Sequence, residues 1–214
     1  MKNLSISQSY LLCVLNEKGK LPSFSTEISV CLVASGMLDL ISAGVVAIDN
    51  KKLYAIGDID NNYQYLKSLY DFIKNTRNVT LEKVASEYCF SFTNKKLTAL
   101  MEDVGETLVK EQCVTSEKGG FFGNLTCFIV NPKEVDFIIQ AIRAEILENG
   151  AMSEEMIALA SLLEKSGQLQ RYFSKYEKKQ LKERISEIRK DSSNKLVKEM
   201  VDYINTMIAV LATI

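Results

Sequence analysis

The stretch VTSEKGGFFGNLTCFIV, residues 114–130, predicts a β-hairpin within a chain whose other patterns are mostly helical. One β run covers residues 113–116 and a second covers 125–130. The tip between them consists of Lys118, Gly119, Gly120, Phe121, Phe122 and Gly123. Paired glycines permit the positive φ angles of a hairpin turn. Two phenylalanines at a projecting tip would each gain about 1.5–3 kcal/mol on burial. We therefore expect the tip to enter a membrane, contact a second copy or fold back onto its own flank.

The composition is that of an ordinary globular protein, with 47% apolar and 25% charged residues among 214. A chain of this length can bury a sizeable core, and we expect one domain that spans residues 1–214. Lys and Arg number 26 against 27 Asp and Glu, which leaves a net charge of −1. No overall field therefore attracts nucleic acid, and an anionic partner must be met by a local basic patch.

Residues suited to catalysis or metal binding are scarce. The chain has no histidine, which removes the usual general base and the usual metal ligand. It also has no GxxxxGK[ST] loop, and its adjacent acidic pairs at 102–103 and 154–155 point to different helix faces. Five cysteines form no CxxC pair and are expected to be small core side chains in a reducing compartment: Cys13, Cys31, Cys89, Cys113 and Cys127. A disulfide between Cys113 and Cys127 is the alternative. We expect no enzymatic activity, cofactor or metal.

The ends of the chain bear on its location. The opening MKNLSISQSY has no long apolar region, so it does not resemble a secretory signal. The most apolar tail, residues 207–214, is far shorter than the roughly 20 residues that span a bilayer. We expect a cytoplasmic protein that lies on a membrane without crossing it.

Apolar spacing of three and four residues predicts a mainly α fold. Helices are expected from an N-cap at Ser7 toward the Gly19 turn, and then over about 26–41, 65–73, 80–88, 94–110, 134–148, 153–166, 176–190 and 196–214. Thr80 and Ser153 are the expected caps of the two helices that they begin. A second short hairpin is expected at 45–48 and 53–56. The last helix becomes apolar nearly all round, which is typical of a helix buried in the middle of an all-α domain. The predicted fold is a single globular domain of many helices around a buried central helix, with one protruding apolar hairpin.

Residues 80–130 also have the outline of a winged helix, with 94–110 as its recognition helix. Glu102, Asp103 and Glu106 would then face phosphates with the wrong sign, and Lys95 and Lys96 lie only at its start. DNA binding is therefore kept as a third alternative, and we expect no nucleic-acid partner.

A basic run covers residues 171–198, with ten Lys and Arg against four Asp and Glu, a surplus of six positive charges. Such a run is usually a solvated helix face. It could also attract an anionic membrane at about 1 kcal/mol per well-placed basic residue.

Several stretches in order resemble one known family. They are LSISQSYLLCVLNEKGK (4–20), LVASGMLDLISAGVV (32–46) with its acidic Asp39, LVKEQCVTSEKGGFFGNLTCFIV (108–130), MIALASLLEKSGQLQRYFS (156–174) and KKQLKERISEIRK (178–190), followed by a final apolar helix. Together they are similar to the Golgi phosphoprotein 3 family of lipid-binding peripheral adaptors. The absence of a long polar N-terminal extension suggests a short, prokaryotic-type member.

The resemblance implies a mostly helical domain around a buried helix and a basic pocket for phosphatidylinositol 4-phosphate beside an inserting hairpin. It also implies oligomers and binding to cytosolic tails of membrane proteins. The family's pocket aromatic corresponds to Phe24, and its basic positions fall at Val33, Thr98 and Met101. Lys95 and Lys96, one turn away from Thr98, are the candidate replacements.

We therefore predict a peripheral membrane-binding adaptor that recognises anionic lipid, of the phosphoinositide type by resemblance, and inserts its hairpin. The alternative is a homo-oligomeric scaffold that uses the hairpin for self-association without a lipid ligand.

Overall fold

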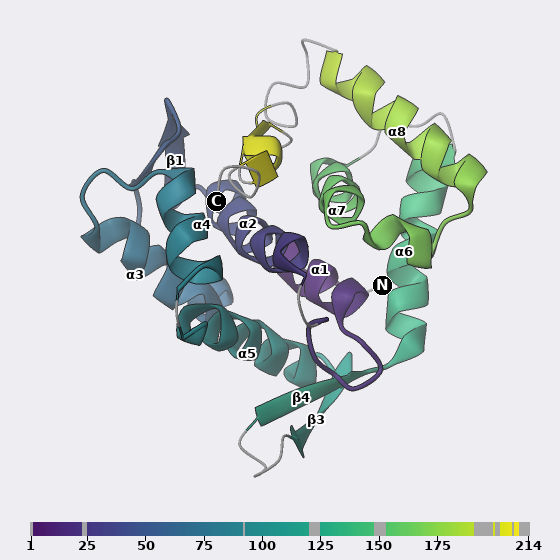
Figure 1. Cartoon of the computed structure of the whole chain (residues 1–214), viewed down its shortest axis with the longest axis horizontal. Coiled ribbons are helices and arrows are strands. Elements are labelled where there is room, and N and C mark those ends of the chain that lie inside the picture. The colour runs from purple at the N-terminus through teal and green to yellow at the C-terminus, as the bar shows by residue number, and fades with distance from the viewer. Residues whose placement is uncertain are drawn as a thin grey trace.

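A buried pair of consecutive helices forms the centre of the computed structural model, with the other elements packed around it (Figure 1). The structure describes residues 2–22, 25–91, 93–119, 125–147, 153–190, 199, 202–206 and 208–209. The side chains of 146, 147, 189 and 190 are outside this description. The predicted mainly α fold with small antiparallel hairpins is confirmed.

The elements follow in chain order. They are α1 (Ile6–Val14), α2 (Thr26–Ser42), β1 (Val46–Asp49), β2 (Lys52–Ala55), η1 (Asn61–Leu66), α3 (Lys67–Asn75), α4 (Leu81–Cys89), α5 (Lys95–Lys110), β3 (Val114–Gly119), β4 (Leu125–Val130), α6 (Pro132–Leu147), α7 (Glu154–Lys165), η2 (Gln168–Arg171) and α8 (Lys175–Lys190).

The central buried helix is α1, in which all nine residues are buried. It contacts α2, α5, α6 and α7, so it is enclosed on every side. The prediction that the last helix occupies the middle is wrong for the described part of 196–214. There Ile204 is buried, whereas residues 202, 203, 205, 206 and 208 are half-buried and Ala209 is exposed. One apolar face suffices to pack this segment against the surface of the core.

Helix starts follow local chemistry, with one correction. Ser5, not Ser7, caps α1, because its side chain accepts from the Gln8 N–H while the Gln8 side chain accepts from the Ser5 N–H. Ser7 instead donates its hydroxyl to the buried Asp39 of α2. The predicted caps Thr80 and Ser153 are confirmed for α4 and α7.

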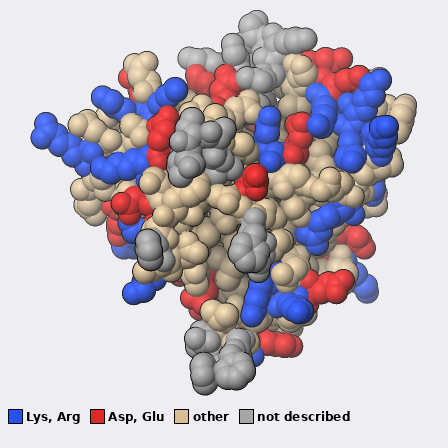
Figure 2. All heavy atoms as spheres, viewed as in Figure 1, with Lys and Arg blue, Asp and Glu red and all other residues tan. Residues whose placement is uncertain are grey.

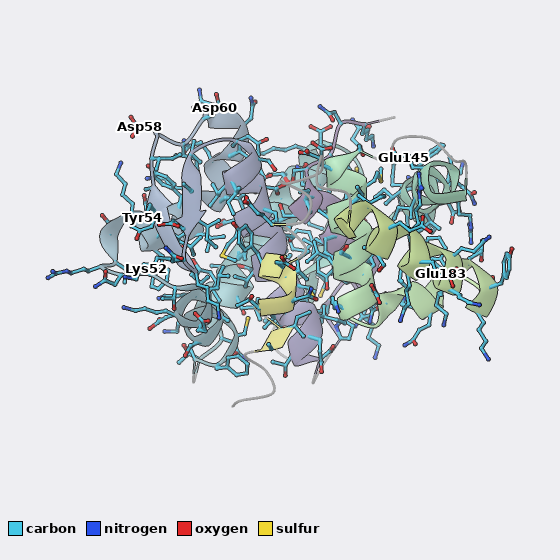
Figure 3. All side chains as sticks on the ribbon, turned by 90° about the horizontal axis from the view of Figure 1, so that it is seen from above. Lys52, Tyr54, Asp58, Asp60, Glu145 and Glu183 are labelled. Carbon is cyan, nitrogen blue, oxygen red and sulfur yellow. The ribbon has the colours of Figure 1, made fainter. Side chains whose placement is uncertain are left out.

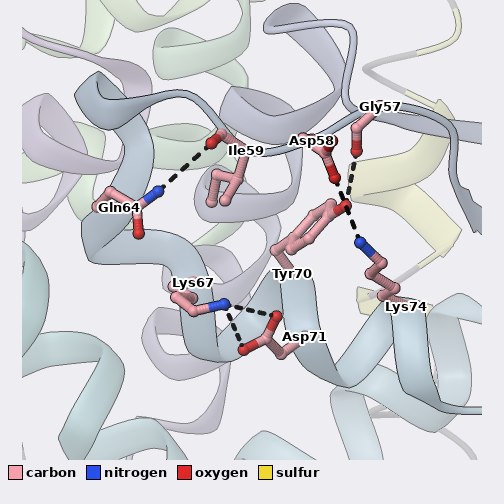
Figure 4. A network of polar contacts seen from close by, with 8 residues as sticks. All are labelled: Gly57, Asp58, Ile59, Gln64, Lys67, Tyr70, Asp71 and Lys74. Atoms are coloured by element: carbon pink, nitrogen blue, oxygen red, sulfur yellow. Dashed lines mark hydrogen bonds and ion pairs between the residues drawn. The ribbon is translucent and has the colours of Figure 1, made fainter.

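The β1–β2 hairpin has a two-residue turn, Asn50-Lys51, in which both residues have positive φ angles. Such a turn matches the twist of its strands. Behind the hairpin, the Tyr70 hydroxyl donates to the Gly57 carbonyl at 2.6 Å, and Lys74 bridges to Asp58 at 3.4 Å (Figure 4). These contacts attach the chain after β2 to helix α3.

The two regions with special surface chemistry lie on opposite sides of the molecule. The β3–β4 hairpin projects at the bottom of Figure 1, whereas α8 lies at the top. Figure 2 shows Lys and Arg side chains gathered over α8, away from the hairpin. Helix α8, which holds most of the described part of the basic run, and strands β3 and β4 therefore lie on opposite sides of the molecule.

Helix α8 begins with a charge arrangement that predicts a pH effect. The Glu177 carboxylate accepts from the Ser174 N–H at 2.7 Å and from Arg143 Nε at 2.8 Å. These donors, the Ser174 backbone first, lower the pKa of Glu177 to about 2. A pKa below its unfolded value contributes stability that is present above the unfolded pKa and is lost as pH falls toward 2.

We therefore expect Glu177→Gln to lower the melting temperature at pH 7, and we expect the difference from wild type to shrink steadily as the pH falls from about 4.3, the unfolded pKa of a glutamate, to 2. Thermal unfolding of both proteins across this range, followed by circular dichroism, measures the difference. A difference that stays constant with pH would contradict this account of the α8 start.

Candidate functional site

The root of the β3–β4 hairpin is fixed to the helical body by Phe128. Its backbone N–H donates to the Gly19 carbonyl at 2.8 Å, and its buried ring covers Gly105 of α5. A Cβ at Gly105 would lie 2.4 Å from two ring atoms of Phe128, so only glycine allows the ring this close. The loop after α1 and the helix α5 thus hold the hairpin in one direction.

The strands extend further toward the tip than the sequence predicted. Lys118 pairs with Thr126 and Gly119 with Leu125, so both residues belong to strand β3 rather than to the tip. Cross-strand pairing of the whole segment 114–119 with 125–130 overrides the local turn preference of the first glycine. The remaining predicted tip residues, Gly120, Phe121, Phe122 and Gly123, lie outside the described residues.

The cysteines of the hairpin do not face one another. Cys127 pairs with Glu117, whereas Cys113 precedes the first paired residue, and all five cysteines are free thiols. Burial raises the pKa of the Cys13, Cys31 and Cys89 thiols to about 12, so these three are protonated at neutral pH. Because Cys113 and Cys127 are free thiols that do not face one another, the alternative of a disulfide between them is wrong.

A pocket of about 450 Å³ opens beside the hairpin root. It lies where the loop after α1, the starts of α2 and α5, the end of α4 and strand β4 meet. Its lining residues are Lys20, Leu21, Pro22, Ser25, Thr26, Ser29, Cys89, Asn94, Leu97, Thr98, Met101, Leu125 and Thr126. We call this space the root pocket.

Two helices of sixteen or more residues begin at the root pocket. The cap residues Ser25 of α2 and Asn94 of α5 both line it, and neither side chain accepts a hydrogen bond from its own helix. The first N–H groups of a helix carry partial positive charge and favour an anion. The side-chain hydroxyls of Thr26 and Thr98 are further donors around the same space, whereas the Ser29 hydroxyl donates to the Ser25 carbonyl at 3.4 Å.

Among the described residues that line the root pocket, Lys20 is the one cation. A Cβ built at Gly119 would lie 3.8 Å from Lys20 Nζ, so this ammonium group sits beside the hairpin strand. The backbone of Lys20 is held by Asn16, whose N–H donates to the Lys20 carbonyl at 2.9 Å and whose side chain accepts from the Lys20 N–H. The positive charge is thus placed between the pocket and the hairpin.

The lysines predicted for the head-group site do not line this pocket. Lys96 forms an ion pair with Glu87 at 2.7 Å and lies 4.4 Å from the centre of the Phe72 ring, on the α3–α4 side of α5. Lys95 is exposed outside the lining, and Phe24 lies outside the described residues. The position at Val33 is fully buried in the core, whereas those at Thr98 and Met101 do line the pocket.

Sequence reasoning missed most of the lining. Lys20, Ser25, Asn94 and Thr126 come from four separate segments, and no local pattern joins them. The one available signal was the charged glycine turn NEKGK before Pro22, which ends on Lys20.

The middle turns of α5 carry three carboxylates, whereas its lysines lie at the two ends of the helix. Burial and the neighbouring charges of Glu106 and Glu102 raise the pKa of Asp103, which shows that these carboxylates share one surface. Three carboxylates this close together repel the phosphate groups of DNA.

The described part of the chain lacks a metal-binding cluster and a membrane-spanning helix. No group of three or more Cys, Asp or Glu side chains there is placed to hold a metal ion. No helix in the described ranges combines the length and apolar content that crossing a bilayer requires.

Comparison with known proteins identifies the family. The curated proteins contain no match to this chain. The family model of Golgi phosphoprotein 3 (GPP34) matches residues 6–205, which is nearly the whole chain and includes the root pocket and the hairpin. The chain therefore belongs to the Golgi phosphoprotein 3 family.

Proposed function

We propose that this protein is a peripheral membrane-binding adaptor whose β3–β4 hairpin enters the bilayer while the root pocket holds an anionic lipid head group. The observation that carries the proposal is the position of the pocket, which opens at the base of the β3–β4 hairpin where that hairpin projects from the helical body (Figure 1). A lipid whose head group sat in the pocket would have its acyl chains beside the hairpin.

The lining supports a phosphate-bearing head group of low charge. Two helix starts and the hydroxyls of Thr26 and Thr98 offer hydrogen bonds to phosphate oxygens, while Lys20 supplies one full positive charge. A head group with an extra phosphomonoester needs several charge-assisted donors. We therefore propose recognition of anionic phospholipid in general, with less selectivity for phosphoinositides than a pocket rich in arginine would give.

The chemistry of the site supports binding rather than catalysis. The pocket thiol of Cys89 is protonated, and the lining residues that the structure describes include no carboxylate. The three carboxylates of α5 give no support to DNA binding. We propose a protein without enzymatic activity that acts at the cytoplasmic face of a membrane.

Flotation with liposomes tests the proposal. Wild type is expected to float with vesicles that contain phosphatidylglycerol or phosphatidylserine and to stay behind with neutral phosphatidylcholine vesicles. Lys20→Glu is expected to weaken anionic vesicle binding about 5- to 30-fold, because a basic residue at the surface contributes about 1 kcal/mol and its reversal about twice that.

Lys52→Glu on β2 is the matched control, since Lys52 is exposed and lies outside the root pocket. It is expected to float like wild type. Equal loss in both variants would show that only total charge matters, and failure of wild type to float with any vesicle would refute the proposed function.

A further inference from the structure

Four lysines form one stripe of helix α8. Lys175, Lys178, Lys179 and Lys182 follow the spacing i, i+3, i+4, i+7, which places their side chains on one face of a helix. They border a hollow of about 490 Å³ between α8 and the end of α7 with η2. We call these four residues the lysine stripe.

The charges around the hollow do not balance. Glu164 pairs with Lys182 at 3.2 Å, and Glu183 approaches Lys179 at 3.8 Å. Within the described ranges, Lys175 and Lys178 have no carboxylate at ion-pair distance. Four lysines against two glutamates leave two positive charges, in a chain whose net charge is −1.

The position of the stripe favours a protein partner over a lipid surface. Helix α8 lies on the side of the molecule opposite the β3–β4 hairpin (Figure 1). This step rests on the proposed function: if the hairpin meets the bilayer, helix α8 with its lysine stripe lies on the opposite side of the molecule from the bilayer. An anionic membrane therefore cannot contact the stripe and the hairpin at once.

We propose that the lysine stripe is a docking surface for an acidic segment of a partner protein, whose carboxylates meet Lys175 and Lys178 across the hollow. Charge complementarity selects the segment and orients it on the surface. Because these side chains are exposed or half-exposed, the interaction weakens as salt screens it. The two ends of the adaptor would then serve a membrane and a protein separately.

Fluorescence anisotropy with a labelled twelve-residue peptide of alternating Glu and Ser provides the test, in solution without vesicles. Lys175→Glu/Lys178→Glu is expected to weaken binding about tenfold, and Lys175→Gln/Lys178→Gln about threefold, the effects of losing two exposed ion pairs with or without reversal. A glutamate at residue 175 suits the first turn of α8, so folding is retained.

The control is Lys52→Glu/Lys83→Glu, which makes the same charge change on β2 and α4. Lys52 and Glu183 lie at opposite ends of the molecule (Figure 3). The control is expected to bind the peptide like wild type. Equal weakening by control and stripe variants, or no weakening by the stripe variant, overturns the proposal.

A second experiment, flotation with vesicles, separates the proposed membrane binding from the proposed peptide binding. Flotation of the Lys175→Glu/Lys178→Glu protein with anionic vesicles is expected to equal that of wild type, and wild type alone is expected to carry the peptide up with the vesicles. Loss of flotation in the stripe variant would assign the lysine stripe to the membrane instead. If wild type itself does not float, the proposed function fails, while the anisotropy in solution still decides the peptide site.

Discussion

The double variant Phe121→Ser/Phe122→Ser is expected to bind anionic vesicles at least about a hundredfold more weakly than wild type. Each phenylalanine gains about 1.5–3 kcal/mol when it leaves water, so the pair supplies about 3–6 kcal/mol of membrane affinity. The hairpin root is held by Phe128, Gly19 and Gly105, and the variant leaves these contacts intact. Equilibrium binding to vesicles of graded concentration measures the loss.

Phe137→Ser is the matched control, because Phe137 is a phenylalanine of α6 with 58% of its surface exposed. It is expected to bind vesicles like wild type. Gel filtration of each protein tests the alternative, which is self-association through the hairpin. If the double variant changes only in oligomer size while vesicle binding stays as in wild type, the hairpin serves self-association and the membrane account is wrong.

Replacement of Asp39 by asparagine is expected to lower the free energy of unfolding by about 2–4 kcal/mol, because it leaves buried donors at the start of α1 without acceptors. The Asp39 carboxylate accepts from the Ile6 N–H at 2.9 Å, the Ser7 N–H at 3.0 Å and the Ser7 hydroxyl at 2.5 Å. An asparagine side chain presents one oxygen and one NH2 group, so one of these donors would face another donor.

The loss of stability in Asp39→Asn is large because Asp39 is buried. The side chain is 3% exposed, and burial raises its pKa although the Ser7 and Ile6 donors act in the opposite direction. Asp71→Asn is the control, because Asp71 forms a partly exposed ion pair with Lys67 at 2.9 Å. Urea denaturation at pH 7 compares the three proteins. A stability of the Asp39 variant within about 0.5 kcal/mol of wild type, the usual range for surface substitutions, would contradict the capping role.

The helices and hairpins were predictable because their signals are local. Apolar residues at helical spacing located α2 to α8 within a few residues, and the cap residues Thr80 and Ser153 marked the starts of α4 and α7. The central position of α1 was not predictable. Polar residues such as Ser7 and Gln8 are typical of a solvent-facing helix side, yet both are buried against partners from α2 and α5.

The candidate site was predictable only in its outline. The hairpin has a continuous signature between residues 114 and 130, so its place was found from the sequence. The pocket depends on the approach of four separate segments, which only tertiary packing decides. Lys95 and Lys96 have the charge that a phosphate head group needs, which is why the sequence pointed to them. In the structure, Glu87 and the Phe72 ring hold Lys96 on another face of α5.

The position of a fluorescent reporter at the hairpin tip tests the central claim most directly. The chain contains no tryptophan, so Phe122→Trp introduces one emission signal at the tip. On anionic vesicles we expect the emission to shift to the blue and to be quenched by lipids brominated near the top of the acyl chains. A vesicle-bound protein whose emission stays as it is in buffer would show that the tip remains in water, which contradicts insertion of the hairpin.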